Sequence, residues 1–259
     1  WHEAHDTGEL EVRFIDDLEP AIVAVASRAG FAACWAMAFA SGKVDGCVVV
    51  WRHARRRPLV SVSVELRHIA DVVRLALERD AALRTLEREA RHDPLTGLVN
   101  RATFYEVLRG ALEAARPVGV LYIDLDGFKP VNDAHGHAAG DAVLHVAAQR
   151  IAAAVRTGDT VARLGGDEFA VVCPEVASAD EVEAVAERLV AAFRQPIEVG
   201  GVKVQVGLSA GVAVFDPASG DTSTLPGPGD VEDRLLAAAD AALYEAKRGG
   251  RGRWARQRH

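Results

Sequence analysis

Two short acidic segments hold the residues of this chain whose types and spacing best suit chemistry. The apolar run at 118–123 ends in Asp124 and Asp126, and residues 165–169 read Gly-Gly-Asp-Glu-Phe. An apolar strand that ends in acids brings carboxylates to the rim of a sheet, where hard oxygen ligands suit Mg²⁺ together with substrate phosphates. A plain polar turn is the alternative for the first segment, and that segment alone does not decide between the two.

The second segment stands where the chain must reverse between two strands. Gly165 and Gly166 allow positive φ, so a glycine-rich hairpin loop explains these two positions. It does not explain Asp167 and Glu168, because adjacent acids repel each other, whereas a bound divalent cation or a proton would relieve the repulsion. The missing glycine side chains would also let a nucleotide approach the backbone closely.

Between these segments, Asn132 and Asp141 carry side chains able to read a purine. An amide presents a donor and an acceptor, and a carboxylate accepts from an N–H edge such as that of guanine. Alternatively, Asp141 is the N-cap of a helix at 141–156 and Asn132 a turn residue; for Asp141 both roles are compatible. His135 and His137 lack a Cys or carboxylate at zinc-ligand spacing, so we expect them to be structural or solvent-facing.

Alternating helices and strands must position these residues. Hydrophobic periodicity predicts helices at 101–115, 141–156, 180–193 and 231–248. Strands are predicted at 118–124, 160–164 and 169–173, with one or two more within 202–215. Residues 216–230, rich in Pro, Gly, Ser and Thr, predict a surface loop. The fold class is therefore an α/β (α+β) sandwich with a central, mostly antiparallel sheet flanked by helices.

A long helix precedes this part of the chain. Residues 60–91 contain no Gly or Pro, and apolar residues recur at steps of three, four and seven: Leu66, Ile69, Val73, Ala76, Leu83 and Ala90. Asp80 and Glu87 interrupt the same stripe, so we expect a short two-stranded stalk rather than a perfect zipper. A helix packed only on its own domain is the alternative. Ahead of it, we expect a helix at 18–29 and strands at 31–40 and 47–51.

The composition limits the classes of protein to which this chain can belong. The 259 residues carry 30 Lys plus Arg against 37 Asp plus Glu, and this net charge of −7 argues against a general nucleic-acid binder. Cys34, Cys47 and Cys173 are scattered, which indicates reduced, mostly buried thiols in a cytoplasmic protein. The longest apolar stretch, 31–40, is too short for a membrane segment, and the start at Trp1 rather than Met indicates a piece of a longer chain.

Five separated motifs together resemble the GGDEF family of diguanylate cyclases. They are Asp93-Pro-Leu-Thr-Gly-Leu-Val-Asn-Arg101, the segments 124–129 and 132–141, the signature 165–169, and the segment 239–251. The resemblance implies a palm-like fold of the nucleotidyl cyclase type. It also implies the family's reaction, in which two GTP molecules condense into cyclic di-GMP (c-di-GMP) and two pyrophosphates.

The resemblance also implies roles for individual residues. Two Mg²⁺ or Mn²⁺ ions per half-site would be held by Asp124, the backbone carbonyl of Leu125, Asp167 and Glu168, and either Asp167 or Glu168 would take the proton. Asn132 and Asp141 would read guanine, and Gly165 and Gly166 would lie against the ribose and α-phosphate. The β- and γ-phosphates would be held by the backbone of Phe128 and by Lys129, Lys247 and Arg251.

Regulation is implied by a further short motif. Arg156-Thr-Gly-Asp159, nine residues before the signature, matches the family's inhibitory site for product c-di-GMP. A helix-terminal Arg followed by a turn Asp is the alternative. Because each half-site holds one GTP, the family's reaction also implies a homodimer, which the helix at 60–91 would promote.

These interpretations divide the chain into four segments. Residues 1–62 resemble part of a GAF sensor domain, 63–91 form the linker helix, 92–253 form the cyclase domain and 254–259 a basic tail. We expect the basic residues at 52–57 to lie in a solvated loop and those at 247–259 in a frayed terminus. Two other functions remain open: a catalytically silent receptor for GTP or c-di-GMP, and an enzyme that makes a mixed or adenine-containing cyclic dinucleotide.

Overall fold

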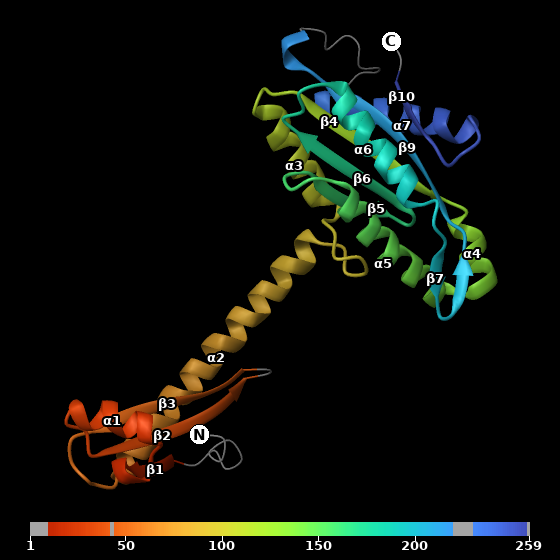
Figure 1. Cartoon of the computed structure of the whole chain (residues 1–259). Helices are drawn as coiled ribbons and strands as arrows, with labels where there is room; N and C mark the ends of the chain where they lie inside the picture. The colour runs from red at the N-terminus through yellow and green to blue at the C-terminus, as the bar shows by residue number, and fades with distance from the viewer. Residues whose placement is uncertain (1–9, 42–43, 220–229, 258–259) are drawn as a thin grey trace. The chain divides into compact units, whose positions relative to one another are not determined.

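The computed structural model describes residues 10–41, 44–219 and 230–257 (Figure 1). The chain divides into two compact units, Trp1–Glu87 and Arg88–His259. Most of the predicted surface loop at 216–230 lies outside the described residues; its first part holds a 3-10 turn at Pro217–Ser219.

The N-terminal unit is built on a three-stranded antiparallel sheet. Its strands, in spatial order, are β1 (Leu10–Phe14), β2 (Ala33–Ser41) and β3 (Val44–Arg52). A 3-10 turn (Ile15–Asp17) and helix α1 (Pro20–Arg28) connect β1 to β2. The sequence patterns placed α1, β2 and β3 to within a few residues and did not include β1.

Helix α2 (Val60–Arg91) confirms the predicted long helix. The apolar stripe on which the prediction rested nevertheless has two different roles. Leu66 of the stripe is buried, together with the neighbouring Ala70, in a small core with Trp35 and Met37 of β2. Ile69 and Leu83 remain 46% and 47% exposed, so only part of the stripe is open to a partner.

The second unit is a five-stranded sheet in the order β10-β9-β4-β6-β5, antiparallel except between β10 and β9. Its strands are β4 (Val118–Asp126), β5 (Thr160–Gly165), β6 (Glu168–Pro174), β9 (Gly207–Phe215) and β10 (Trp254–Arg256). Helices α5 (His137–Ala154) and α6 (Ala179–Ala192) cover one face. Helices α3 (Arg101–Glu113) and α7 (Val231–Arg248) cover the other face (Figure 1). The predicted mostly antiparallel sandwich is confirmed.

Two short elements of this stretch were missing from the prediction: helix α4 (Phe128–His135), which follows β4, and strand β7 (Ile197–Val199). Strand β7 forms a separate hairpin with β8 (Val202–Val204), and β8 and β9 confirm the one or two strands expected within 202–215. Helix α5 begins at His137 rather than at residue 141. Asp141 is therefore inside the helix, and the interpretation of Asp141 as an N-cap is wrong, because Gly136 (φ 81°) is the N-cap residue.

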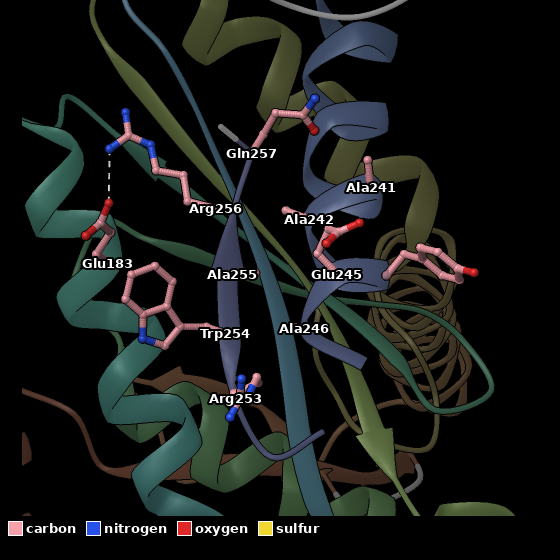
Figure 2. Close-up of a pocket in the computed structure, with 11 residues that line it drawn as sticks. Glu183, Ala241, Ala242, Glu245, Ala246, Arg253, Trp254, Ala255, Arg256 and Gln257 are labelled. Atoms are coloured by element: carbon pink, nitrogen blue, oxygen red, sulfur yellow. Dashed lines mark hydrogen bonds and ion pairs between the residues drawn. The ribbon is translucent and has the colours of Figure 1, made fainter. Parts of the chain in front are cut away.

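The basic C-terminal segment is also more ordered than a frayed terminus. Trp254–Arg256 form strand β10, which pairs in parallel with Ala210–Val212 of β9 and lies between α6 and α7 (Figure 2). The indole of Trp254 packs against the main core, and Arg256 donates to Glu183 of α6 at 3.0 Å. The expectation failed because three residues with one aromatic carry too weak a strand signal.

The expectations about the cysteines and about membrane segments can be compared with the structure. Cys34 and Cys173 are buried as expected, whereas Cys47 is exposed, and all three are free thiols. Among the described residues, no helix combines the length and the apolar character that a membrane crossing requires.

Replacing Trp254 by Ala should lower the free energy of unfolding of the second unit by about 2 kcal/mol, because a half-buried aromatic side chain leaves the core. The matched control is Arg256→Ala, which breaks only a partly exposed ion pair and should cost about 1 kcal/mol or less. Urea unfolding of the whole chain measures both. Equal stability of the wild type and the Trp254 variant would mean that the segment is frayed after all.

Candidate active site

Strand β4 presents its two terminal acids on one face of the sheet. Successive side chains of a strand point to opposite faces, and Leu121, Ile123 and Leu125 are buried beneath α5 and α6. Asp124 and Asp126 therefore point to the face covered by α3 and α7. The core is apolar along most of β4, and the carboxylates appear only where the strand reaches the rim.

The signature hairpin meets the end of β4 through strand pairing. Asp124 is directly opposite Glu168 on β6, and the backbone N–H of Leu125 donates to the carbonyl of Asp167 at 3.2 Å. The Leu125 carbonyl faces the same side of the strand as its N–H, toward the hairpin. The structure thus brings together Asp124, Leu125, Asp167 and Glu168, which lie more than 40 residues apart in two groups along the sequence.

Open space lies over the glycines of the hairpin. Gly165 and Gly166 have φ angles of 152° and 50°, which disfavour any side chain. A Cβ atom built on either glycine would meet no atom within 4 Å. The backbone next to Asp167 is therefore accessible to a ligand.

The carboxylates at this point exceed the positive charge beside them. Burial raises the pKa of Asp167, the neighbouring Asp124 carboxylate raises it further, and Lys247 and Arg163 only partly oppose the change. Lys247 Nζ lies 2.7 Å from Asp124 Oδ2. An additional cation between Asp124 and Asp167 would relieve this imbalance.

The donor set fits a magnesium-type ion. Across the described residues, no three His, Cys, Asp or Glu side chains form a complete metal site by themselves. Mg²⁺ is usually bound by one or two carboxylates and completed by water and substrate phosphates. Asp124 and Asp167, with the Leu125 carbonyl, supply oxygen ligands of that kind.

Tyr122 is a neighbour that the sequence analysis missed. Its hydroxyl donates to Glu168 Oε2 at 3.3 Å. Burial, followed by the charge of Glu168, raises the pKa of Tyr122 to about 12, so the phenol stays protonated and remains a donor. The signal was present in the sequence, because Tyr122 precedes Asp124 by two residues and so shares its face.

The two predicted guanine readers also come together. Asn132 lies on α4 and the exposed Asp141 on α5. A Cβ atom on Gly140 would come within 1.8 Å of Asn132 Oδ1, so Asn132 rests directly on the glycine that precedes Asp141. His135 and His137 are exposed, in line with the solvent-facing alternative.

The predicted phosphate ligands occupy two helix ends. Phe128, buried, and Lys129, exposed, form the first turn of α4, which no side chain caps. The N–H groups of such a turn are suited to phosphate oxygens. Lys247 lies in the last turn of α7, and Arg251 follows that helix in a left-handed conformation (φ 59°).

The hairpin that carries residues 165–169 is held by a pair of residues, Arg163 and Asp93, whose contact was not predicted from the sequence. Arg163 on β5 donates to the carbonyl of Gly166 at 2.9 and 3.0 Å and to both carboxylate oxygens of Asp93 at 3.1 and 3.2 Å. Thr96 donates to Asp93 through its N–H and its hydroxyl. Burial alone would raise the pKa of Asp93, but the hydrogen bonds from Thr96 and Arg163 hold it below its ordinary value.

Arg156 and Asp159 form a separate, internally paired site. The side chain of Asp159 is fully buried and accepts from the Arg156 guanidinium and backbone N–H, each at 3.1 Å. The guanidinium also donates to the carbonyl of Pro174 and is half exposed beside a cavity of about 200 Å³. In this structure Asp159 orients Arg156, and Arg156 is the residue of the pair that a ligand can reach.

Known proteins are similar in sequence to this region. The family model described as "Diguanylate cyclase, GGDEF domain" matches residues 90–253. The bifunctional diguanylate cyclase/cyclic di-GMP phosphodiesterase MucR of Pseudomonas aeruginosa is 41% identical over 181 residues, which are 68% of this chain and 25% of MucR. Diguanylate cyclase TpbB of the same species is 42% identical over 65% of this chain and 38% of its own length. This chain thus spans less than two fifths of these relatives.

Solved structures are similar over the same region. The GGDEF domain of TpbB (YfiN) from Pseudomonas aeruginosa is 41% identical, with a TM-score of 0.56, over 64% of this chain and 94% of that one. The coiled coil and GGDEF domain of DgcB from Caulobacter crescentus, in complex with c-di-GMP, is 28% identical, with a TM-score of 0.62, over 73% and 97%. The family match begins at residue 90, so the GAF-like resemblance of residues 1–62 and the four segment boundaries stay predictions.

Replacing Asp93 by Asn should lower the free energy of unfolding at neutral pH by about 1–3 kcal/mol, since Arg163 loses its buried charged acceptor. Because the pKa of Asp93 is lowered in the folded state, its contribution is present above the ordinary carboxyl pKa and is lost as the pH falls through the folded pKa. The stability difference between the two proteins should therefore shrink in acid. Urea unfolding at neutral and acidic pH measures it, with exposed Asp133→Asn as the control; a difference independent of pH would contradict the assignment.

Proposed function

The chain belongs to the GGDEF family of diguanylate cyclase domains, and on that premise we propose that residues 90–253 condense two GTP molecules into c-di-GMP and two pyrophosphates. One observation carries the proposal most directly. The end of β4 and the signature hairpin are joined in register, Asp124 opposite Glu168 and Leu125 bonded to Asp167. Lys247 is at the same point, 2.7 Å from Asp124.

The acidic residues would hold the cations that the reaction needs. Asp124, the Leu125 carbonyl, Asp167 and Glu168 would bind two Mg²⁺ or Mn²⁺ per half-site. When bound, such ions lower the pKa of the attacking 3′-hydroxyl and neutralise charge on the attacked phosphate and the leaving group. Either Asp167 or Glu168 would accept the proton of the 3′-hydroxyl.

The remaining residues would bind and orient GTP. Asn132 and Asp141, adjacent through Gly140, would read the guanine edge. The open backbone at Gly165 and Gly166 would lie against the ribose and the α-phosphate. The uncapped first turn of α4, with the N–H of Phe128 and the side chain of Lys129, would bind the β- and γ-phosphates from one side, and Lys247 and Arg251 from the other.

Turnover would require two copies of the chain. One half-site holds one GTP, and in this reaction each GTP attacks the other. Helix α2 supports a homodimer, because Ile69, Val72, Leu83 and Leu86 are between 46% and 61% exposed along it. A parallel two-stranded stalk would raise the local concentration of the partner domain.

Product feedback would act through Arg156. Its guanidinium is fixed by the buried Asp159 and by the Pro174 carbonyl, and it is half exposed to solvent. A planar guanidinium held in this way suits the phosphates or guanine edges of c-di-GMP. Asp159 would contribute by holding Arg156 in place, with direct contact to product only if the pair opens.

The central test is incubation of the whole chain with GTP, ATP and Mg²⁺, with products identified by mass. Wild type should make c-di-GMP, chelation of the metal should stop it, and Asp167→Ala should abolish it, a loss of at least about 10³-fold if a cation ligand is removed. The matched control is Asp180→Ala, an acid on the surface of α6. Near-normal turnover by Asp167→Ala would overturn its role.

The same assay separates the alternatives. Nucleotide binding without any product would indicate a receptor module, and an adenine-containing product would indicate a different cyclase. Specific activity should fall when the enzyme is diluted, because the reaction needs paired half-sites. Activity per chain that does not change on dilution, in protein shown to be monomeric, would contradict the dimer.

Replacing Arg156 by Ala should raise the c-di-GMP concentration that halves the rate by about tenfold or more, as expected when a charge-assisted phosphate contact is lost. Initial rates at low product should stay near those of wild type. Arg116→Ala is the control, since Arg116 is an exposed arginine that pairs with Glu175 and does not line the cavity. Unchanged product inhibition in the Arg156 variant would remove this site from the proposal.

A further inference from the structure

Asp126 is a buried carboxylate that the proposed mechanism does not use. Its side chain is only 9% exposed, at the last residue of β4. Oδ2 accepts from the hydroxyl of Ser209 at 2.7 Å and from the backbone N–H of Gly252 at 3.0 Å. Oδ1 is enclosed and has no hydrogen-bond partner, and the Nε atom of Arg251 is 3.8 Å away from it.

The sheet is shaped to hold this carboxylate. Asp126 is opposite Gly207 on β9, and a Cβ atom on that glycine would lie 3.2 Å from Cβ and 3.3 Å from Oδ2 of Asp126. Ser209, the donor from the same strand, is completely buried. Burying a carboxylate is costly unless its oxygens are paired, so the position requires partners in addition to Ser209.

Those partners come from the turn that follows α7. Arg251 has φ 59° and is flanked by Gly250 and Gly252, both also at positive φ. A left-handed backbone is unfavourable for a residue with a side chain and persists only where the surroundings hold it. The hydrogen bond from Gly252 N–H to Asp126 ties this turn to the sheet. Together with the attraction between Asp126 and the Arg251 guanidinium, it stabilises the left-handed backbone of Arg251.

The two acids at the end of β4 thus differ in how they contact the two cations, one in the last turn of α7 and one in the turn that follows it. Asp124 forms a close ion pair with Lys247 at 2.7 Å. Asp126 faces Arg251 at 3.8 Å, beyond hydrogen-bonding distance, and the Arg251 side chain is 67% exposed. The Arg251 guanidinium therefore lies beside Asp126 without a hydrogen bond to it and has its donors available to another anion.

From this arrangement we infer that Asp126 is a positioning residue for triphosphate recognition: it fixes the Arg251–Gly252 turn so that the guanidinium meets the terminal phosphates of the nucleotide. The inference rests on the proposed function, which places Arg251 on those phosphates. It assigns to Asp126 selectivity for a nucleoside triphosphate over a monophosphate, with no contact to the nucleotide itself.

The test compares binding of 3′-deoxy-GTP and 3′-deoxy-GMP to the full chain by calorimetry with Mg²⁺; neither can be cyclised, because both lack the attacking hydroxyl. In Asp126→Asn, the dissociation constant for the triphosphate should rise about tenfold while that for the monophosphate stays unchanged. Arg251→Ala should show the same pattern. The double variant should be no worse than Arg251→Ala alone, because both changes remove one interaction.

Two further variants keep the inference falsifiable. Ser209→Ala removes one donor to Asp126 and should reduce triphosphate selectivity in the same direction by a smaller factor, even if Asp126→Asn folds poorly. Asp180→Asn on α6 is the control and should leave both constants unchanged. Equal weakening of both nucleotides, an unchanged ratio in the Asp126 and Ser209 variants, or additive effects in the double variant would overturn the inference.

The same measurements distinguish this inference from the proposed function. Wild type that binds 3′-deoxy-GTP selectively but makes no c-di-GMP from GTP would overturn the cyclase and leave the role of Asp126 standing. Wild type that makes c-di-GMP, with Asp126→Asn as selective as wild type, would overturn only the role of Asp126. Wild type that binds neither nucleotide would overturn both.

Discussion

The candidate site depends on the pairing register between β4 and its two neighbours. Asp124 is opposite Glu168 on one side and Ser209 on the other, and a shift of one residue would turn every side chain of β4 to the wrong face. The buried core prevents such a shift, because Leu121, Ile123 and Leu125 fill the face beneath α5 and α6. The same apolar packing that stabilises the sheet therefore sets the positions of the acids at its rim.

Part of the negative charge at this rim is offset by partners from distant parts of the sequence. Asp124 pairs with Lys247, Asp126 holds the turn around Arg251, and Asp93 binds Arg163 across 70 residues. Each contact ties a loop or helix end to the sheet, and charge-assisted hydrogen bonds of this kind are stronger and more directional than neutral ones. The loops around the site are therefore held in place by the same residue types that would bind an anionic substrate.

Local patterns in the sequence were sufficient to predict the sandwich and the long helix α2, whereas the meeting of the strand end with the hairpin was implied by the family resemblance. Patterns of alternation and turn chemistry determine such features over a few residues. What could not be predicted depends on long-range contacts. Strand β10 forms by pairing with the edge of β9, which is distant in the sequence. The contact between Asp126 and the N–H of Gly252 likewise forms only in the folded chain. Arg163 was missed because its two partners, Asp93 and Gly166, meet only in the folded hairpin.

Helix α7 and the segment after it connect these observations. Lys247 lies in its last turn, Arg251 and Gly252 form the turn that follows, and Trp254–Arg256 pair with β9. Because β10 anchors this turn on one side and Asp126 on the other, Arg251 is fixed at both ends of a short connection, and its strained backbone is supported by the sheet itself. Lys247 differs, since on the proposed function its close contact with Asp124 would be exchanged or shared when a triphosphate and its cation bind. On the proposed function the two cations would have complementary roles, because the turn that carries Arg251 is fixed in advance and Lys247 offsets part of the acidic charge until the substrate binds.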